Sequence, residues 1–340
     1  REVDRATLIR AVSLSSVSRA FWRTGVTERE VDRGRLLDQC RSASALVCST
    51  MAGVEAAAPA PLGAAKLCIG FVGCGTISTA IARGLCRRRA GSAGGSAGED
   101  SGVVRFPLAV TRRNAEKTAG LVAEFGEDKV YVLDTSQAVV DRSDVVVIGL
   151  TPKVALEVLP TLKLRPEQLV INLVSTVTNQ RIRELIVLPT ATVVKCVPLP
   201  PVALHAGVSA LSPSHRVIEA LFGVLGTVVA VESEEQLKVF QAATAMMGPF
   251  YQTVVTVHGW MTANGVPDAD AAAYAGGFFK CISADSAVKQ SGAGLAHLVA
   301  EQTPGGLNEE AIKRHAEAGC YSAHGAALDA ILARLQKAQL

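Results

Sequence analysis

The stretch from Lys66 to Leu85, KLCIGFVGCGTISTAIARGL, joins a short apolar run to a glycine-rich turn and then to a helical pattern. The run is almost continuously apolar, which is typical of a parallel strand buried on both faces. Gly73 and Gly75 supply the first two glycines of a G-x-G-x-x-G motif, and Ser78 takes the third position. Ser78 is small enough for close packing of the helix on the strand, which is the role of the third glycine.

The helical pattern begins near Thr76, so the free N–H groups of its first turn would point at a phosphate. The motif therefore predicts a phosphate loop between a strand and a helix, although an ordinary glycine turn is the alternative interpretation. The candidate cofactor contacts in the loop are Gly73, Gly75, Thr76, Ile77 and Ser78. Cys74 lies inside the loop, where the helix dipole would lower the pKa of its thiol, although the position requires only a small side chain.

A second strand, about 103–110, is expected after a glycine- and serine-rich insertion and leads into Thr111, Arg112 and Arg113. An acidic residue at this strand end would hold a ribose 2′-hydroxyl, whereas arginine accommodates a 2′-phosphate. The strand end carries two arginines and no acid, which favours NADP, with NAD possible. A solvated basic turn is the alternative.

Strands and helices continue to alternate as far as residue 231. This rhythm predicts an α/β fold with a Rossmann-type, doubly wound, mainly parallel sheet, whose ligands bind outside the carboxyl ends of the strands. Leu150, Thr151 and Pro152 stand at the end of an expected strand over 144–150, and Pro198 follows one over 192–197.

From Ser233 onward the composition changes to helix formers, and helices are expected over about 234–246, 249–264, 268–288, 291–300, 309–318 and 321–338. We predict an NADP-binding domain over 66–232 and an all-helical dimerisation and substrate domain over 233–340. Apolar faces on the long helices favour a homodimer or a higher homo-oligomer, although burial within one subunit is the alternative.

Composition excludes several classes of protein. The 340 residues include 34 basic and 31 acidic ones, and residues 1–50 supply the whole excess, with nine Arg against six acids. The rest is neutral, so we expect no nucleic-acid partner. Eight cysteines without paired spacing argue against a disulfide or zinc framework and predict no metal site. No run reaches the roughly 20 apolar residues that cross a bilayer, so we expect a soluble, cytoplasmic protein without a membrane partner.

Residues 1–65 are expected to be an extension that is disordered or not native. The first 50 are rich in Arg and Ser, as an organellar transit peptide would be, but their acidic residues count against that interpretation. Met51 opens a cleaner sequence that leads into the first strand, and we expect the native start there.

Four stretches in this order resemble the pyrroline-5-carboxylate reductase family: IGFVGCGTISTAIARGL, KCVPLPPVALHAGVSAL, GPFYQTVVTVHGWMTANGVPDADA and EQTPGGLNEEAIKRHAEAG. The resemblance runs from about Lys66 to the C-terminus. It implies that NADPH lies on the glycine loop and passes a hydride to the C=N carbon of a cyclic imine, which yields proline. It also implies an active site between the Rossmann domain and the helical domain, usually completed by a dimer partner.

The resemblance places the substrate at Thr303, Gly305 and Gly306, where backbone N–H groups at a helix start could hold a carboxylate. Leu307 and Asn308 stand where the family has two threonines, so they are the candidate catalytic positions; Asn308 can cap the helix, while Leu307 has no hydroxyl. The resemblance also implies that Leu150, Thr151, Pro152 and Pro198 are cofactor contacts. Thr151 and the 198–201 segment depart from the family pattern. The chain thus resembles a divergent member, an imine reductase of the proline-biosynthetic type. A reductase of another small imine or carbonyl compound and a non-catalytic NADP-binding oligomer are the alternatives.

Overall fold

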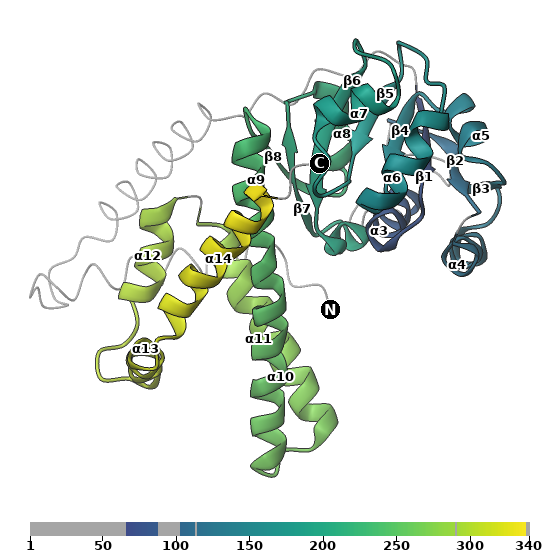
Figure 1. Cartoon of the computed structure of the whole chain (residues 1–340). Helices are drawn as coiled ribbons and strands as arrows, with labels where there is room; N and C mark the ends of the chain where they lie inside the picture. Colours follow the sequence, from purple (N-terminus) through teal and green to yellow (C-terminus); the bar gives the residue numbers. More distant parts are fainter. Residues whose placement is uncertain (1–65, 88–102, 113, 290, 338–340) are drawn as a thin grey trace, which may run out of the picture. The chain divides into compact units, whose positions relative to one another are not determined.

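The computed structural model describes residues 66–87, 103–112, 114–289 and 291–337, which lie in one compact unit. Strands and helices alternate up to Ala230, and the described residues beyond it form helices (Figure 1). In chain order the elements are β1 (Leu67–Val72), α3 (Thr76–Cys86), β2 (Val104–Thr111), α4 (Ala115–Phe125), β3 (Val130–Leu133), α5 (Ser136–Asp141), β4 (Val145–Ile148), α6 (Pro152–Val158), η1 (Leu159–Thr161), β5 (Leu169–Asn172), α7 (Asn179–Leu185), β6 (Thr192–Pro198), η2 (Pro200–Leu204), β7 (Gly207–Ser212), α8 (Arg216–Gly223), β8 (Gly226–Ala230), α9 (Glu234–Ala243), η3 (Thr244–Met246), α10 (Met247–Ala263), α11 (Asp268–Ala287), α12 (Gly292–Ala300), α13 (Leu307–Glu317) and α14 (Cys320–Lys337).

The described strands form one eight-stranded sheet in the order β3-β2-β1-β4-β5-β6-β7-β8. Strands β1 to β6 are parallel, and β7 pairs antiparallel with β6. The short η2 segment connects β6 to β7, and a parallel return needs a crossover of a dozen or more residues, so β7 must run the other way. The predicted fold class is confirmed, and the strand order reverses between β1 and β4, where ligands of such sheets bind.

Two apolar cores cover the two faces of the sheet, because successive side chains of a strand point to opposite sides. In β1, Ile69 and Phe71 pack with side chains of α3, α4 and α8, while Val72 packs with side chains of α5, α6 and α7. All three residues are fully buried. The prediction of a central strand buried on both faces is therefore confirmed, and it places the glycine loop at the middle of the sheet edge.

The helices after β8 pack differently. Helix α9 begins at a Ser233 cap and contacts β6, β7 and α14, while α10 pairs with α11 and α13 pairs with α14. In the described helices α10 to α14, Ala271 and Ala275 are the residues that become buried. None of the helices in the described ranges combines the length and apolar character of a membrane span.

The expected extension over residues 1–65 and the candidate Arg113 lie outside the described residues. The division into domains at residue 232, between β8 and α9, stays a prediction.

Candidate functional site

The glycine loop turns sharply at the carboxyl end of β1. Gly73 has a φ of +94°, and a Cβ atom there would lie 2.6 Å from the carbonyl oxygen of Gly149, so the fold itself requires glycine. Gly75 differs, because a Cβ at this position would meet only the Gly149 oxygen, at 3.7 Å. The fold leaves space above Gly75, as close approach of a ligand to the backbone would require.

Helix α3 opens directly onto this loop. Its N-cap is Gly75, which offers no side-chain cap, so the amides of Thr76, Ile77 and Ser78 are available to an anion. Ser78 is buried and occupies the space left by the missing side chain of Gly149. It thus packs the helix onto β4, as expected, and its Oγ has no hydrogen-bond partner among the described residues.

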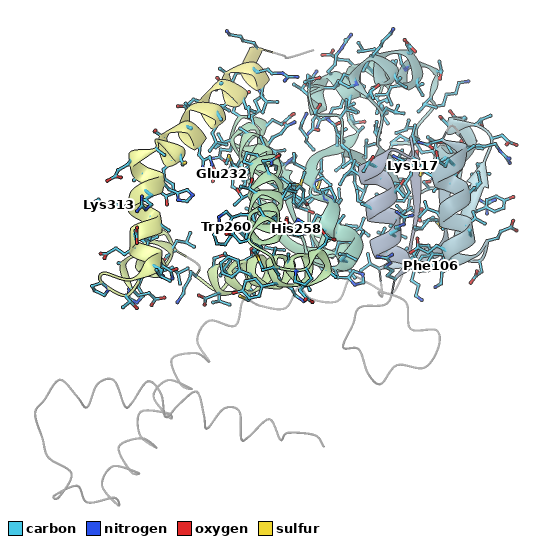
Figure 2. All side chains as sticks on the ribbon, turned by 90° about the horizontal axis from the view of Figure 1, so that it is seen from below. Phe106, Lys117, Glu232, His258, Trp260 and Lys313 are labelled. Atoms are coloured by element: carbon cyan, nitrogen blue, oxygen red, sulfur yellow. The ribbon has the colours of Figure 1, made fainter. Side chains whose placement is uncertain are left out.

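Side chains from the neighbouring strand and helix fix the loop. The Gly73 N–H donates to Thr111 Oγ1 at 3.3 Å, which ties the loop to the end of β2. Lys117 reaches over from α4 and donates its Nζ proton to Thr76 Oγ1 at 2.8 Å (Figure 2). Lys117 places a cation at the mouth of the loop, although its position inside a helical pattern gave no sign of this role.

An acidic residue lies beside Arg112 after all. Asp134, the residue after β3, accepts a hydrogen bond from Arg112 Nε at 2.7 Å, and both side chains are exposed. The end of β2 carries no acid of its own, as expected, but the end of the neighbouring strand β3 supplies one. Parallel strands end at one edge of a sheet, so the residue that follows β3 lies next to the residue that follows β2.

Cys74 fits the interpretation that the loop requires only a small side chain at its position. Its thiol is buried beside Thr79, and burial raises the pKa of the thiol, with the Thr79 hydroxyl and nearby cations opposing that rise. A raised pKa leaves little reactive thiolate, so the idea that the helix dipole activates this cysteine is wrong.

The other candidate cofactor residues gather at the same edge of the sheet. Leu150 follows β4, Thr151 is the N-cap of α6 and Pro152 is the first residue of α6, the position where proline is best tolerated. Leu150 also approaches the glycine loop, since a Cβ on Gly73 would lie 2.6 Å from its Cδ2 atom. Pro198 is buried at the end of β6. The structure thus places these residues at the same sheet edge as the glycine loop, with Leu150 beside the loop itself.

The candidate substrate segment lies at the start of α13. Gly305 has a φ of +69°, and its N–H donates to Glu309 Oε2 at 2.6 Å, while the Gly306 N–H donates to the Thr303 carbonyl. Gly306 is the N-cap of α13, so the expectation that Asn308 caps this helix is wrong.

Neither candidate catalytic position of this segment contacts the glycine loop within the part of the chain that the structure describes. Asn308 Nδ2 donates to Gln302 Oε1 at 2.7 Å, a contact within the same segment, and Leu307 is 85% exposed. The other hydrogen bonds of the segment in the described residues join it to α13, and Gln302 Nε2 donates to the Leu298 carbonyl of α12 at 2.7 Å.

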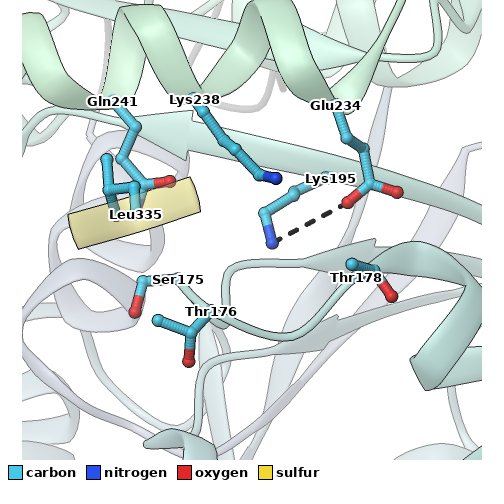
Figure 3. Close-up of a pocket in the computed structure, with 8 residues that line it drawn as sticks. All are labelled: Ser175, Thr176, Thr178, Lys195, Glu234, Lys238, Gln241 and Leu335. Atoms are coloured by element: carbon cyan, nitrogen blue, oxygen red, sulfur yellow. Dashed lines mark ion pairs between the residues drawn. The ribbon is translucent and has the colours of Figure 1, made fainter. Parts of the chain in front are cut away.

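A pocket that sequence reasoning missed lies at the carboxyl ends of β5 and β6 (Figure 3). Its centre is Lys195 of β6, whose side chain is only 7% exposed. Burial lowers the pKa of Lys195 to about 8, although Glu234 opposes the shift. The signal was available, because a lysine in the apolar strand TVVKCV must be paired or functional.

The comparisons with known proteins agree with this arrangement. Residues 68–176 match the model of a family described as NADP oxidoreductase, coenzyme F420-dependent. No curated protein matches the sequence. Among solved structures, similar folds occur in pyrroline-5-carboxylate reductases.

The chain has the pyrroline-5-carboxylate reductase fold. The enzyme of Coxiella burnetii is 21% identical, with 81% of this chain and 100% of that chain covered and a TM-score of 0.64. The Streptococcus pyogenes enzyme is 17% identical, with 80% and 99% covered and a TM-score of 0.64. The Plasmodium falciparum enzyme, solved with NADP bound, is 15% identical, with 81% and 98% covered and a TM-score of 0.65. The predicted resemblance is confirmed at the level of the fold.

Proposed function

We propose that the chain is an NADPH-dependent reductase of a small cyclic imine, of the type that converts pyrroline-5-carboxylate to proline. The observation that carries this proposal is the open glycine loop at the point where the strand order reverses, with an uncapped helix start and Lys117 beside it. The match of residues 68–176 to a family of NADP oxidoreductases and the shared fold support it.

The residues present fit a dinucleotide phosphate. The amides of the first turn of α3 would hold the pyrophosphate, while Arg112 and Arg113 would face the 2′-phosphate. When bound, NADPH supplies a hydride for the C=N carbon of an imine. The chain's own contribution is to hold the imine close to the strand ends and to exclude water from the site.

A homodimer is part of the proposal. The 303–308 segment makes no recorded hydrogen bond to the glycine loop in the described residues, so a second copy would have to bring the two together. Leu307 and Asn308 favour two further candidates: a reductase of another small imine or carbonyl compound, and an NADP-binding oligomer without activity. A Leu307→Thr/Asn308→Thr variant that gains activity would indicate a degraded proline-type site.

The test is steady oxidation of NADPH and of NADH by the full-length protein with pyrroline-5-carboxylate and a panel of related imines. Turnover that depends on an imine and is faster with NADPH supports the proposal. In an Arg112→Ala/Arg113→Ala variant the preference for NADPH should fall at least about ten-fold, since contacts to a charged phosphate contribute about 1.5 to 3 kcal/mol each. Tight NADPH binding without turnover of any imine would favour the binding oligomer.

A further inference from the structure

The pocket at the ends of β5 and β6 uses its charged groups to hold the chain itself. Lys195 Nζ lies 3.9 Å from Glu234 Oε2, and Lys238 Nζ donates to Glu235 Oε1 at 2.6 Å. Both carboxylates belong to α9, so two lysines are balanced by two acids of one helix (Figure 3). The remaining hydrogen bonds of Lys195 go to the backbone of a neighbouring loop.

This loop, residues 174–177, follows β5 and is fixed by two buried side chains. Lys195 Nζ donates to the Val177 carbonyl at 2.6 Å and to the Val174 carbonyl at 3.1 Å. Asn172, the last residue of β5, donates to the Val177 carbonyl at 2.9 Å and accepts from the Val174 N–H at 2.9 Å. Four hydrogen bonds between buried residues therefore hold both ends of the loop.

A lysine is an unfavourable residue for this position unless its hydrogen bonds are needed. Burial lowers the pKa of Lys195 to about 8, which shows that the fold opposes its charge. An apolar side chain would suit β6, where Val193 and Val194 are buried, but it would leave the Val174 carbonyl without this donor. The lysine thus gives the loop a support that an apolar residue cannot give.

The loop lies on the half of the sheet that the nicotinamide would use. A dinucleotide crosses the sheet edge where the strand order reverses, between β1 and β4, and each half of it lies over one half of the sheet. In the proposed site the 2′-phosphate of the adenosine half faces Arg112, at the end of β2. The nicotinamide half therefore belongs over the ends of β4 and β5, where the 174–177 loop begins.

The same cluster connects the loop to the helices that follow the sheet. Glu234, the first residue of α9, accepts from the Asn179 N–H at 3.0 Å. Asn179 begins α7 directly after the loop, and its Oδ1 accepts from Asn172 Nδ2 at 3.2 Å. The start of α9 is therefore held against both Lys195 and the residue that ends the loop.

We infer that Lys195 and Asn172 are positioning residues for hydride transfer, which hold the 174–177 loop in the shape that supports the nicotinamide. Glu234 fixes Lys195 from the side of α9. These residues act through the loop and not on the substrate itself. The inference rests on the proposed reductase function, which places the nicotinamide over this half of the sheet.

The test measures hydride transfer and cofactor binding separately in the full-length protein. Lys195→Met keeps an unbranched side chain and removes the donors. The rate constant of NADPH oxidation in a single turnover, with the imine that the wild type reduces fastest, should fall about ten- to 100-fold, because small displacements of a reactant slow the reaction strongly. The Kd of NADPH, measured by calorimetry, should change less than about three-fold, since the glycine loop is untouched. Lys195→Arg, which restores N–H donors, should recover part of the rate.

Lys238→Met is the matched control, because it removes a second buried lysine of the pocket, one that donates to Glu235 and not to the loop. Its rate constant should stay within about two-fold of the wild-type value. Glu234→Gln provides a second test if Lys195→Met does not fold, and it should lower the rate constant about two- to five-fold.

A residue with a merely structural role would lower the free energy of unfolding and leave hydride transfer in the folded protein unchanged. Unchanged hydride transfer in folded Lys195→Met or, if that variant does not fold, in Glu234→Gln therefore overturns the inference. So does a loss of rate in Lys238→Met that is as large as the loss in Lys195→Met.

A measurement without turnover separates this inference from the proposed function. The fluorescence of bound NADPH increases when the nicotinamide is held rigidly, so Lys195→Met at saturation should lose about half of the increase that the wild type shows. If no imine is reduced, the proposed function fails, and an unchanged fluorescence then overturns the inference as well, while the expected loss supports it. A wild type that does not bind NADPH contradicts both.

Discussion

The sheet and the helices that follow it use apolar side chains in opposite ways. Along β1, Ile69, Phe71 and Val72 are buried between two layers of helices within the same chain. On the later helices, Trp260 is 67% exposed and Tyr274 is 64% exposed. Figure 2 labels Trp260 on its helix. The sheet therefore completes its own core, while the later helices present apolar surface that the described residues leave uncovered, as the homodimer that we propose would require.

The largest effect is expected where this exposed surface is made charged. If α10 and α11 form the homodimer interface that we propose, a Trp260→Glu/Tyr274→Glu variant should weaken dimerisation about 1,000-fold or more, since buried aromatic residues dominate interfaces. Sedimentation velocity across a dilution series measures the change.

The control replaces an equally exposed apolar residue of the sheet region. Val187→Asp should leave assembly unchanged, because Val187 lies between α7 and β6 and is 79% exposed. If the Trp260→Glu/Tyr274→Glu variant stays dimeric, or if Val187→Asp dissociates the dimer, the interface does not lie on α10 and α11 as we propose.

A substitution in the sheet region should lower the stability of the fold and leave dimerisation unchanged. Gly73→Ala introduces a Cβ 2.6 Å from the Gly149 carbonyl in a left-handed conformation, so it should lower the free energy of unfolding by roughly 2 to 3 kcal/mol. Denaturant titration of both proteins gives the value. A loss below about 0.5 kcal/mol would show that the loop relaxes easily and that the fold does not require glycine there.

Lys195 gives the sheet a stability that depends on pH. Its pKa is about 8 in the folded protein and 10.5 when exposed, because burial disfavours the ammonium form. Between these values the unfolded chain binds more protons, so the free energy of unfolding should rise with pH, by roughly 2 to 3 kcal/mol across the window.

The charged groups that act on Lys195 are Glu234 and Lys238 of α9. Lys195→Met lacks the titrating group, so its unfolding free energy should miss this rise. If the unfolding free energies of the wild type and Lys195→Met changed with pH in the same way, Lys195 would not be desolvated in the folded protein.

The smallest effect concerns the Arg112–Asp134 pair. Both side chains are exposed, so Asp134→Asn should change stability by less than about 0.5 kcal/mol. It should nevertheless tighten NADPH binding about two- to four-fold, because the guanidinium no longer has a competing carboxylate. Unchanged NADPH affinity would place the 2′-phosphate away from Arg112.

These residues also show what sequence reasoning could and could not reach. The apolar run of β1 and the glycines after it predicted the local structure, because a continuous apolar run and a glycine-rich turn are patterns of adjacent residues. The pairing of Arg112 with Asp134 could not be found, since it depends on strand order and not on spacing. Asn308 was assigned to the wrong helical position because a glycine N-cap leaves no side-chain signal.

The most direct test of the account is NADPH binding by Gly75→Ala compared with the wild type. Gly75 has a φ of −76° and open space beside it, so alanine should leave the unfolding free energy within about 0.5 kcal/mol of the wild-type value. If the pyrophosphate approaches the backbone here, NADPH affinity measured by calorimetry should fall at least about ten-fold. Equal NADPH affinities in the two proteins, or no NADPH binding by the wild type, would contradict the account.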